Sequence, residues 1–187
     1  MAEQIALRDA FGKALVELGK ENPRIVVLDA DLANSTKANM FEAAYPDRFF
    51  QVGIAEQNMM GIAAGLATMG FIPFTSTFAC FATKRATDQI RIVIAQPKLN
   101  VKITGGYSGL LSGKTGKTHQ SVQDIAIMRS MPDMVVLVPG DGVEATKAIR
   151  AAADYDGPVY IRLTRDPSPV IFDDGYDFQI GKAVILR

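Results

Sequence analysis

The chain has 187 residues, enough for one domain whose buried core needs neither disulfides nor a metal. It is 48% hydrophobic and 21% charged, with 20 Lys and Arg residues balanced by 20 Asp and Glu residues. Zero net charge argues against nucleic-acid binding as the main activity, and a single cysteine and a single histidine argue against disulfides and zinc sites.

Nothing in the sequence indicates export or membrane insertion. The first residues, MAEQIALRDAF, lack the basic start and continuous apolar stretch of a secretory signal. No apolar run approaches the ~20 residues that a membrane-spanning helix needs. We therefore expect a cytoplasmic protein that binds neither membranes nor nucleic acid.

Apolar residues recur at helical spacing from Leu7 to Leu18, and Gly19 follows, so the chain is predicted to open on an amphipathic helix. Short apolar runs predict buried strands at residues 25–28, 71–74, 101–104, 135–138 and 159–163. Helical patterns between them cover residues 57–67, 83–95, 121–129 and 143–153. Continuous apolar strands that alternate with helices indicate an α/β fold, with a parallel sheet covered by helices on both faces.

The end of the chain, residues 181–187 (GKAVILR), rises into another apolar run without a polar tail. This pattern favours the first strand of a further domain that is cut off. A short C-terminal edge strand is the alternative.

Two glycine-containing motifs resemble ligand sites but lack necessary residues. Residues 113–118 (GKTGKT) resemble a phosphate-binding loop without the earlier glycine that such a loop needs. Residues 140–142 (GDG) resemble a metal-binding signature, but the asparagine that completes it is missing, because none follows Asn100. We expect a strand-to-helix turn at residues 140–142 and no metal ligands in this chain.

Polar residues gather just after the predicted strands. They are Asp29, Asp31 and Ser35, residues 76–81, residues 105–119, and Arg165 with Asp166. Because ligands of open parallel sheets bind beyond the carboxyl ends of the strands, we expect one site along this edge. Loops of any α/β protein are polar, so the pattern alone does not name the ligand.

Five segments together resemble the pyrimidine-binding domain of transketolases in their order and spacing. They are residues 31–35 (DLANS), 52–57 (VGIAEQ), 76–81 (STFACF), 118–120 (THQ) and 163–165 (LTR). The resemblance implies the thiamine diphosphate-binding fold of that domain over residues 1–176. Residues 177–187 would then be the start of a missing C-terminal domain or a terminal strand.

Glu56 matches the glutamate of this family that meets N1′ of the aminopyrimidine ring of thiamine diphosphate. The resemblance implies that its carboxyl group shares a proton with N1′ and so activates the cofactor. An apolar, water-poor pocket raises the proton affinity of such a group. The alternative is a glutamate placed at a helix start, where the helix dipole favours it.

The resemblance also assigns residues around the cofactor. Phe78 and Phe81 match the aromatic residues that pack on the pyrimidine ring, with ordinary core packing as their alternative. Asp31 matches an acidic residue near the cofactor across the dimer interface, or is an exposed loop carboxylate. Lys84 stands where many transketolases have a third aromatic residue, which makes the pocket less aromatic.

Arg8, Ser35 and Arg165 match positions that hold the sugar phosphate, a role that suits the charged fork of an arginine. For Arg8 the alternative is a solvated charge on a helix. Two positions on the substrate side depart from the family. Thr115 replaces an aspartate that reads a donor-sugar hydroxyl, and Tyr107 replaces a phosphate-contacting histidine, so the ketose and aldose are not specified.

His119 is the only histidine. It matches one that contacts the substrate near the reacting carbon, where it could relay a proton to a carbonyl oxygen. Alternatively, His119 simply precedes a helix capped by Ser121 and Asp124.

The resemblance implies one subunit of a split transketolase, which transfers a two-carbon ketol unit between sugar phosphates. We expect activity only with an N-terminal, diphosphate-binding subunit that carries Mg²⁺ or Ca²⁺, in a homodimer or heterotetramer. A start at Met1, directly before the first helix, favours a separately encoded subunit over an excised domain. The alternatives are a 1-deoxyxylulose-5-phosphate synthase-like subunit, a 2-oxoacid dehydrogenase β-like subunit, or a non-catalytic subunit that retains the fold.

Overall fold

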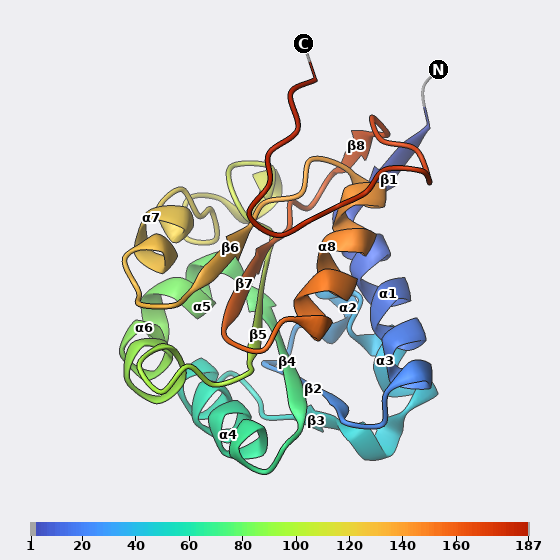
Figure 1. The fold of residues 1–187 in the computed structure, drawn as a ribbon. Helices are drawn as coiled ribbons and strands as arrows, with labels where there is room; N and C mark the ends of the chain where they lie inside the picture. The colour runs from blue at the N-terminus through green and yellow to red at the C-terminus, as the bar shows by residue number, and fades with distance from the viewer. Residues whose placement is uncertain (1–2, 187) are drawn as a thin grey trace.

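The computed structural model describes residues 3–186, which form a parallel sheet between two layers of helices (Figure 1). The sheet has the strand order β3-β2-β4-β5-β7-β6, and every neighbouring pair is parallel. The strands are β2 (Ile25–Asp29), β3 (Phe49–Gln51), β4 (Ile72–Phe78), β5 (Lys102–Gly106), β6 (Val135–Leu137) and β7 (Val159–Arg162). The predicted α/β class is confirmed.

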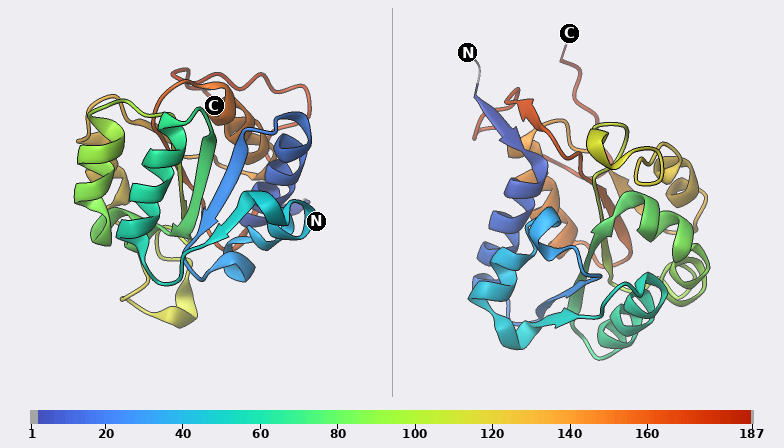
Figure 2. Two further views of the ribbon diagram at one scale, coloured as in Figure 1. Left: turned by 90° about the horizontal axis from the view of Figure 1, so that it is seen from below. Right: turned by 180° about the vertical axis from the view of Figure 1, so that it is seen from behind.

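The two faces of the sheet carry separate hydrophobic cores because successive strand residues point to opposite sides. Val27 packs into the core beneath α1 (Leu7–Glu21) and α8 (Gly142–Asp154), whereas Leu28 packs into the core on the other face. That second core is covered by α4 (Glu56–Thr68), α5 (Ala79–Arg85), η2 (Ile90–Ala95) and α7 (Asp124–Arg129), as Figure 2 shows. Strands buried on both faces explain the unbroken apolar runs of the sequence.

The remaining elements are short, and apart from α6, which lies within the helix expected at residues 83–95, the sequence pattern predicted neither them nor strand β3. They are β1 (Gln4–Ala6), β8 (Pro167–Pro169), α2 (Ala33–Thr36), α3 (Asn39–Ala44), α6 (Thr87–Gln89), η1 (Pro46–Arg48) and η3 (Gly113–Thr115). Strand β1 pairs antiparallel with β8 outside the main sheet. None of these segments is long enough to show a helical or strand period.

Two predicted helices have different bounds. The helix expected at residues 83–95 begins at Ala79 and is interrupted at Ala86, after which α6 and the π-helical η2 continue it. The helix expected at residues 121–129 begins at Asp124.

The GDG triplet forms the expected strand-to-helix turn. Asp141 is the N-cap of α8, and its Oδ1 accepts from the Glu144 backbone N–H at 2.8 Å. Its Oδ2 accepts from the backbone N–H groups of Ile171 and Phe172, at 2.6 and 2.8 Å. Asp141 thus fixes the chain after β8 against the start of α8.

Lys102 is the buried lysine among the described residues. Its side chain is buried, and Nζ donates to the carbonyl oxygens of Tyr155 and Gly157 at 2.6 and 2.8 Å. Burial lowers the pKa of Lys102 to about 7, although Asp156 and Asp154 act in the opposite direction. This lysine joins β5 to the end of α8, at the opposite end of the strands from the predicted site.

After β8, residues 170–186 contain no helix or strand, and Arg187 lies outside the described residues. The domain division at residue 177 therefore stays a prediction. Among the helices of residues 3–186, none has the length and apolar character needed to cross a membrane.

Candidate functional site

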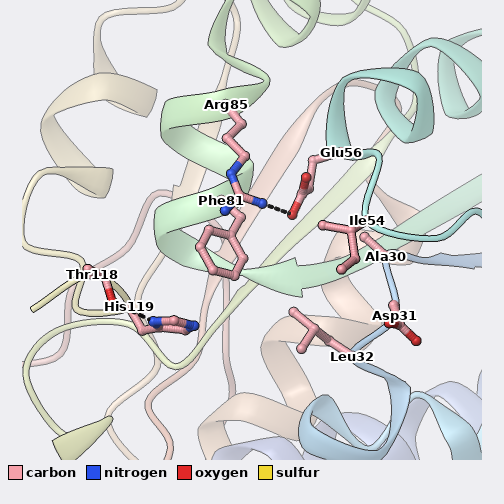
Figure 3. A pocket seen from close by; sticks show the side chains of 9 residues that line it. All are labelled: Ala30, Asp31, Leu32, Ile54, Glu56, Phe81, Arg85, Thr118 and His119. Atoms are coloured by element: carbon pink, nitrogen blue, oxygen red, sulfur yellow. Dashed lines mark hydrogen bonds and ion pairs between the residues drawn. The ribbon is translucent and has the colours of Figure 1, made fainter. Parts of the chain in front are cut away.

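A cavity of ≈ 410 Å³ lies beyond the carboxyl ends of the central strands (Figure 3). Its walls come from the loop after β2, the start of α4, helix α5 and the loop before α7. The lining residues are Ala30, Asp31, Leu32, Ile54, Glu56, Phe81, Arg85, Thr118 and His119. The predicted residues Asp31, Glu56, Phe81 and His119 therefore meet at one site.

Glu56 is the first residue of α4, and its side chain is only 3% exposed. The helix dipole favours a carboxylate there. Burial of that charge requires a partner, which is the Arg85 guanidinium, whose Nη1 donates to Oε1 at 2.9 Å. Glu56 therefore has the position that both interpretations of the sequence expect, because it starts a helix and also faces the cavity.

Arg85 was not predicted to belong to the site. Its guanidinium also lies 4.0 Å from the centre of the Phe81 ring, and its side chain is 48% exposed. Arg85 follows Phe81 by one helical turn, so the i, i+4 spacing could have identified it. Lys84, which stands at the position of a third aromatic residue in many transketolases, is exposed and does not line the cavity.

Phe81 and His119 form one wall of the cavity, and the buried rings of Phe78 and Tyr107 pack behind them without lining it. The Phe78 and Phe81 ring centres are 5.8 Å apart, and the His119 ring meets Phe81 edge-on at 5.2 Å. Phe78 also stacks on Tyr107, with ring centres 4.1 Å apart. The wall is flat and apolar, and offers the kind of surface on which a planar heteroaromatic ring stacks.

His119 lies in the loop before α7, and its Nδ1 is 2.9 Å from Thr118 Oγ1. His119 does precede a helix, α7, but the expected capping by Ser121 and Asp124 is wrong, because α7 begins at Asp124 and has no side-chain cap. Asp124 instead accepts hydrogen bonds from Tyr160 and Arg162, at 2.9 and 2.8 Å. Burial, followed by the Asp124 charge, raises the pKa of Tyr160 well above its ordinary value.

The residues predicted to hold a phosphate gather around Tyr107, next to the aromatic wall. Arg8 Nη1 donates to the Tyr107 hydroxyl at 2.9 Å and to the Ser35 carbonyl oxygen at 3.3 Å. The Arg165 guanidinium lies 5.4 Å from the Tyr107 ring centre, and contact with the Tyr107 hydroxyl raises the pKa of Arg165. Two permanent positive charges therefore flank one buried phenol.

Thr115 is exposed in η3, where its hydroxyl donates to the Ser112 carbonyl oxygen.

Two loops of the cavity are joined by a hydrogen-bonded brace that the sequence did not reveal. Asp29 is buried, and its Oδ1 accepts from the Leu32 backbone N–H at 2.7 Å and from Gln51 Nε2 at 3.0 Å. Gln51 Oε1 then accepts from the backbone N–H groups of Asp31 and Gly53, at 2.8 and 3.1 Å. The brace ties the loop that carries Asp31 to the loop that leads into α4.

Replacing Gln51 with alanine is expected to loosen these loops without unfolding the domain. Gln51 is exposed, so water can replace its hydrogen bonds, and the stability loss should stay below about 1 kcal/mol. Amide hydrogen exchange at residues 30–32 and 53–55 should become faster, while exchange in β4 stays unchanged. Equal exchange in both loops of the variant and the parent would contradict the bracing role.

Fold and site together define an α/β domain with a ligand cavity at the carboxyl ends of its parallel strands. Residues 3–169 match the family model for the transketolase pyrimidine-binding domain. The chain is 48% identical, over 96% of its length, to a Methanocaldococcus jannaschii protein described as a transketolase C-terminal section. It is 43% identical, over 99% of its length, to a 6-deoxy-6-sulfo-D-fructose transketolase subunit of a Clostridium species.

A solved structure described as a split gene transketolase, inactive beta4 tetramer, superposes with a TM-score of 0.85 at 52% identity. It covers 95% of this chain and 57% of the other. The chain belongs to the transketolase family and contains its pyrimidine-binding domain. It spans 58% of the length of each of the two relatives named above.

Proposed function

We propose that this chain is the pyrimidine-binding subunit of a thiamine diphosphate-dependent transketolase, with Glu56 as the residue that activates the cofactor. The observation that supports this most is the buried Glu56 carboxylate, which faces a cavity with an aromatic wall at the strand ends. An aminopyrimidine ring requires a flat apolar surface on which to stack and a carboxyl group that can hydrogen-bond to its ring nitrogen.

The residues present fit the pyrimidine end of thiamine diphosphate. A cavity of ≈ 410 Å³ has room for a single heteroaromatic ring and its substituents. Phe81 would pack on a face of the ring, Phe78 supports Phe81 from behind without lining the cavity, and Asp31 lines the same cavity. When bound, thiamine diphosphate supplies the carbon nucleophile that attacks a ketose carbonyl.

The chain itself would contribute proton handling. The Glu56 carboxyl group, which is buried and faces the cavity, would exchange a proton with N1′. His119, edge-on to Phe81 at the mouth, would donate or accept a proton at the substrate oxygen. These two residues are the proposed catalytic residues.

Arg8, Ser35 and Arg165 are proposed to bind the terminal anion of the substrate. Two guanidinium groups around Tyr107 suit a phosphate, which accepts several charged hydrogen bonds at once. The proposed reaction moves a two-carbon ketol unit between sugar phosphates. A sulfonate would present the same acceptor oxygens, and the Clostridium relative is named for a sulfo-sugar, so a sulfo-ketose is the second candidate substrate.

The diphosphate and its Mg²⁺ or Ca²⁺ are assigned to a separate N-terminal subunit. Among residues 3–186 no group of three or more His, Cys, Asp or Glu side chains is arranged as metal ligands. The relatives described as a C-terminal section and as a split gene product support a two-subunit enzyme. We propose a homodimer of such pairs, a heterotetramer.

The test is reconstitution. The chain alone, with thiamine diphosphate and Mg²⁺, should show no ketol transfer, and addition of the N-terminal subunit should produce it. A panel of ketose phosphates and one sulfo-ketose would identify the donor. Turnover by the isolated chain would contradict the split arrangement. Pyruvate decarboxylation without ketose cleavage would favour the 1-deoxyxylulose-5-phosphate synthase-like or 2-oxoacid dehydrogenase β-like alternative.

A further inference from the structure

Arg85 makes two contacts that a bound pyrimidine ring would need for itself. Its Nη1 donates to Glu56 Oε1 at 2.9 Å, and its guanidinium lies over the Phe81 ring at 4.0 Å (Figure 3). A guanidinium is a flat group with N–H donors at its edge and an apolar face, so it stacks on rings and pairs with carboxylates. It therefore presents to Glu56 and Phe81 the same features as a protonated aminopyrimidine.

The two contacts and the proposed cofactor position exclude one another. Glu56 Oε1 accepts from Arg85, and the Arg85 guanidinium lies over the Phe81 ring. From this we infer that Arg85 is a placeholder for the pyrimidine ring, which neutralises Glu56 in the free subunit and must swing out before the cofactor binds. This inference rests on the proposed function.

Burial indicates which partner would move. The Glu56 side chain is 3% exposed and is fixed at the start of α4, whereas the Arg85 side chain is 48% exposed. Arginine released into solvent is rehydrated, while Glu56 without any partner would remain a buried, unpaired carboxylate. Departure of Arg85 is therefore favourable only when another donor arrives.

The backbone of Arg85 is held in place while its side chain can move. Gln57 Nε2 donates to the Arg85 carbonyl oxygen at 3.0 Å, which joins α4 to the end of α5. This bond keeps the guanidinium within reach of Glu56 in the free subunit. It leaves the long side chain free to rotate toward solvent, where nearly half of its surface already lies.

The experiment is calorimetric titration of thiamine diphosphate, with Mg²⁺, into the complex of this chain and the N-terminal subunit. The Arg85→Gln variant cannot pair with Glu56 as a cation, so its Kd should fall by about 3- to 10-fold. Arg91→Gln is the matched control, because Arg91 is equally exposed (48%) and also pairs with a carboxylate, Asp88, at 2.8 Å. The Kd of this control should equal that of the parent complex.

Arg85→Met is a second variant, which keeps the apolar stem of the side chain. It should also lower the Kd, and circular dichroism of each variant verifies the fold. An unchanged or higher Kd in folded Arg85→Gln and Arg85→Met complexes, beside a parent that binds, overturns the placeholder role alone. Failure of the parent complex to bind thiamine diphosphate contradicts the proposed function itself, and the placeholder role with it.

Discussion

Replacing Glu56 with glutamine is expected to lower the kcat of the reconstituted complex by about 100- to 10,000-fold, the usual contribution of a positioned acid–base group. The amide has nearly the shape of the carboxyl group and can still fill the position at the start of α4. It cannot take and return a proton at N1′. The measurement is the rate of ketol transfer at saturating cofactor, so that weaker binding does not lower the rate.

The matched control is Glu17→Gln, which removes the same charge from an exposed position on α1, a helix that covers the other face of the sheet. Its kcat should equal that of the parent. A Glu56→Gln complex that turns over at the parent rate would show that the carboxyl group has no chemical role. It would favour the non-catalytic subunit, which is the remaining alternative from the sequence.

The sequence predicted five of the six strands of the main sheet, because the signal of a buried strand is strong, and missed only the short, largely exposed edge strand β3. Strands such as β2, with all five residues buried, need apolar side chains on both faces, so their positions appear as unbroken runs. Strand β4 was predicted too short, since Thr75, Ser76 and Thr77 continue it as buried polar residues. Buried polar residues at the carboxyl end of a strand break the usual apolar pattern of a buried strand, and such exceptions are expected near a functional site.

Of the residues that meet at the cavity, only those that lie in a segment resembling the family could be predicted. Glu56, Phe81 and His119 come from separate segments, and their order along the chain supplied the prediction. The i, i+4 spacing could have placed Arg85 next to Phe81, but no local pattern encodes its contact with Glu56 or the contacts of Gln51 with Asp29. Spacing identifies neighbours within one helix, but contacts across loops require the folded structure.

The second large expected effect is a loss of stability on mutation of Asp29, the buried residue at the centre of the brace that joins the two cavity loops. Asp29→Ala should lower the free energy of unfolding by about 2–4 kcal/mol, because it removes the acceptor of two hydrogen bonds in a buried site. Asp29→Asn keeps an oxygen for the Leu32 N–H and the Gln51 amide, and removes the buried charge of the carboxylate, whose Oδ2 has no hydrogen-bond partner among the described residues. It should therefore retain the parent stability or exceed it by about 1 kcal/mol.

The pH dependence of the free energy of unfolding, compared between the parent and Asp29→Asn, tests whether the buried charge of Asp29 causes their difference in stability. Burial raises the pKa of Asp29, and the hydrogen bonds from Gln51 and Leu32 only partly offset that effect. A carboxyl group whose pKa is raised in the fold stabilises the fold below its unfolded pKa, about 4, and loses this contribution as pH rises through the folded value. Asparagine does not titrate, so urea unfolding should show the gain of Asp29→Asn over the parent at pH 7 and little gain at pH 4. A gain of equal size at both pH values would show that the buried charge is not the cause, and that the amide stabilises the loop by its hydrogen bonds alone.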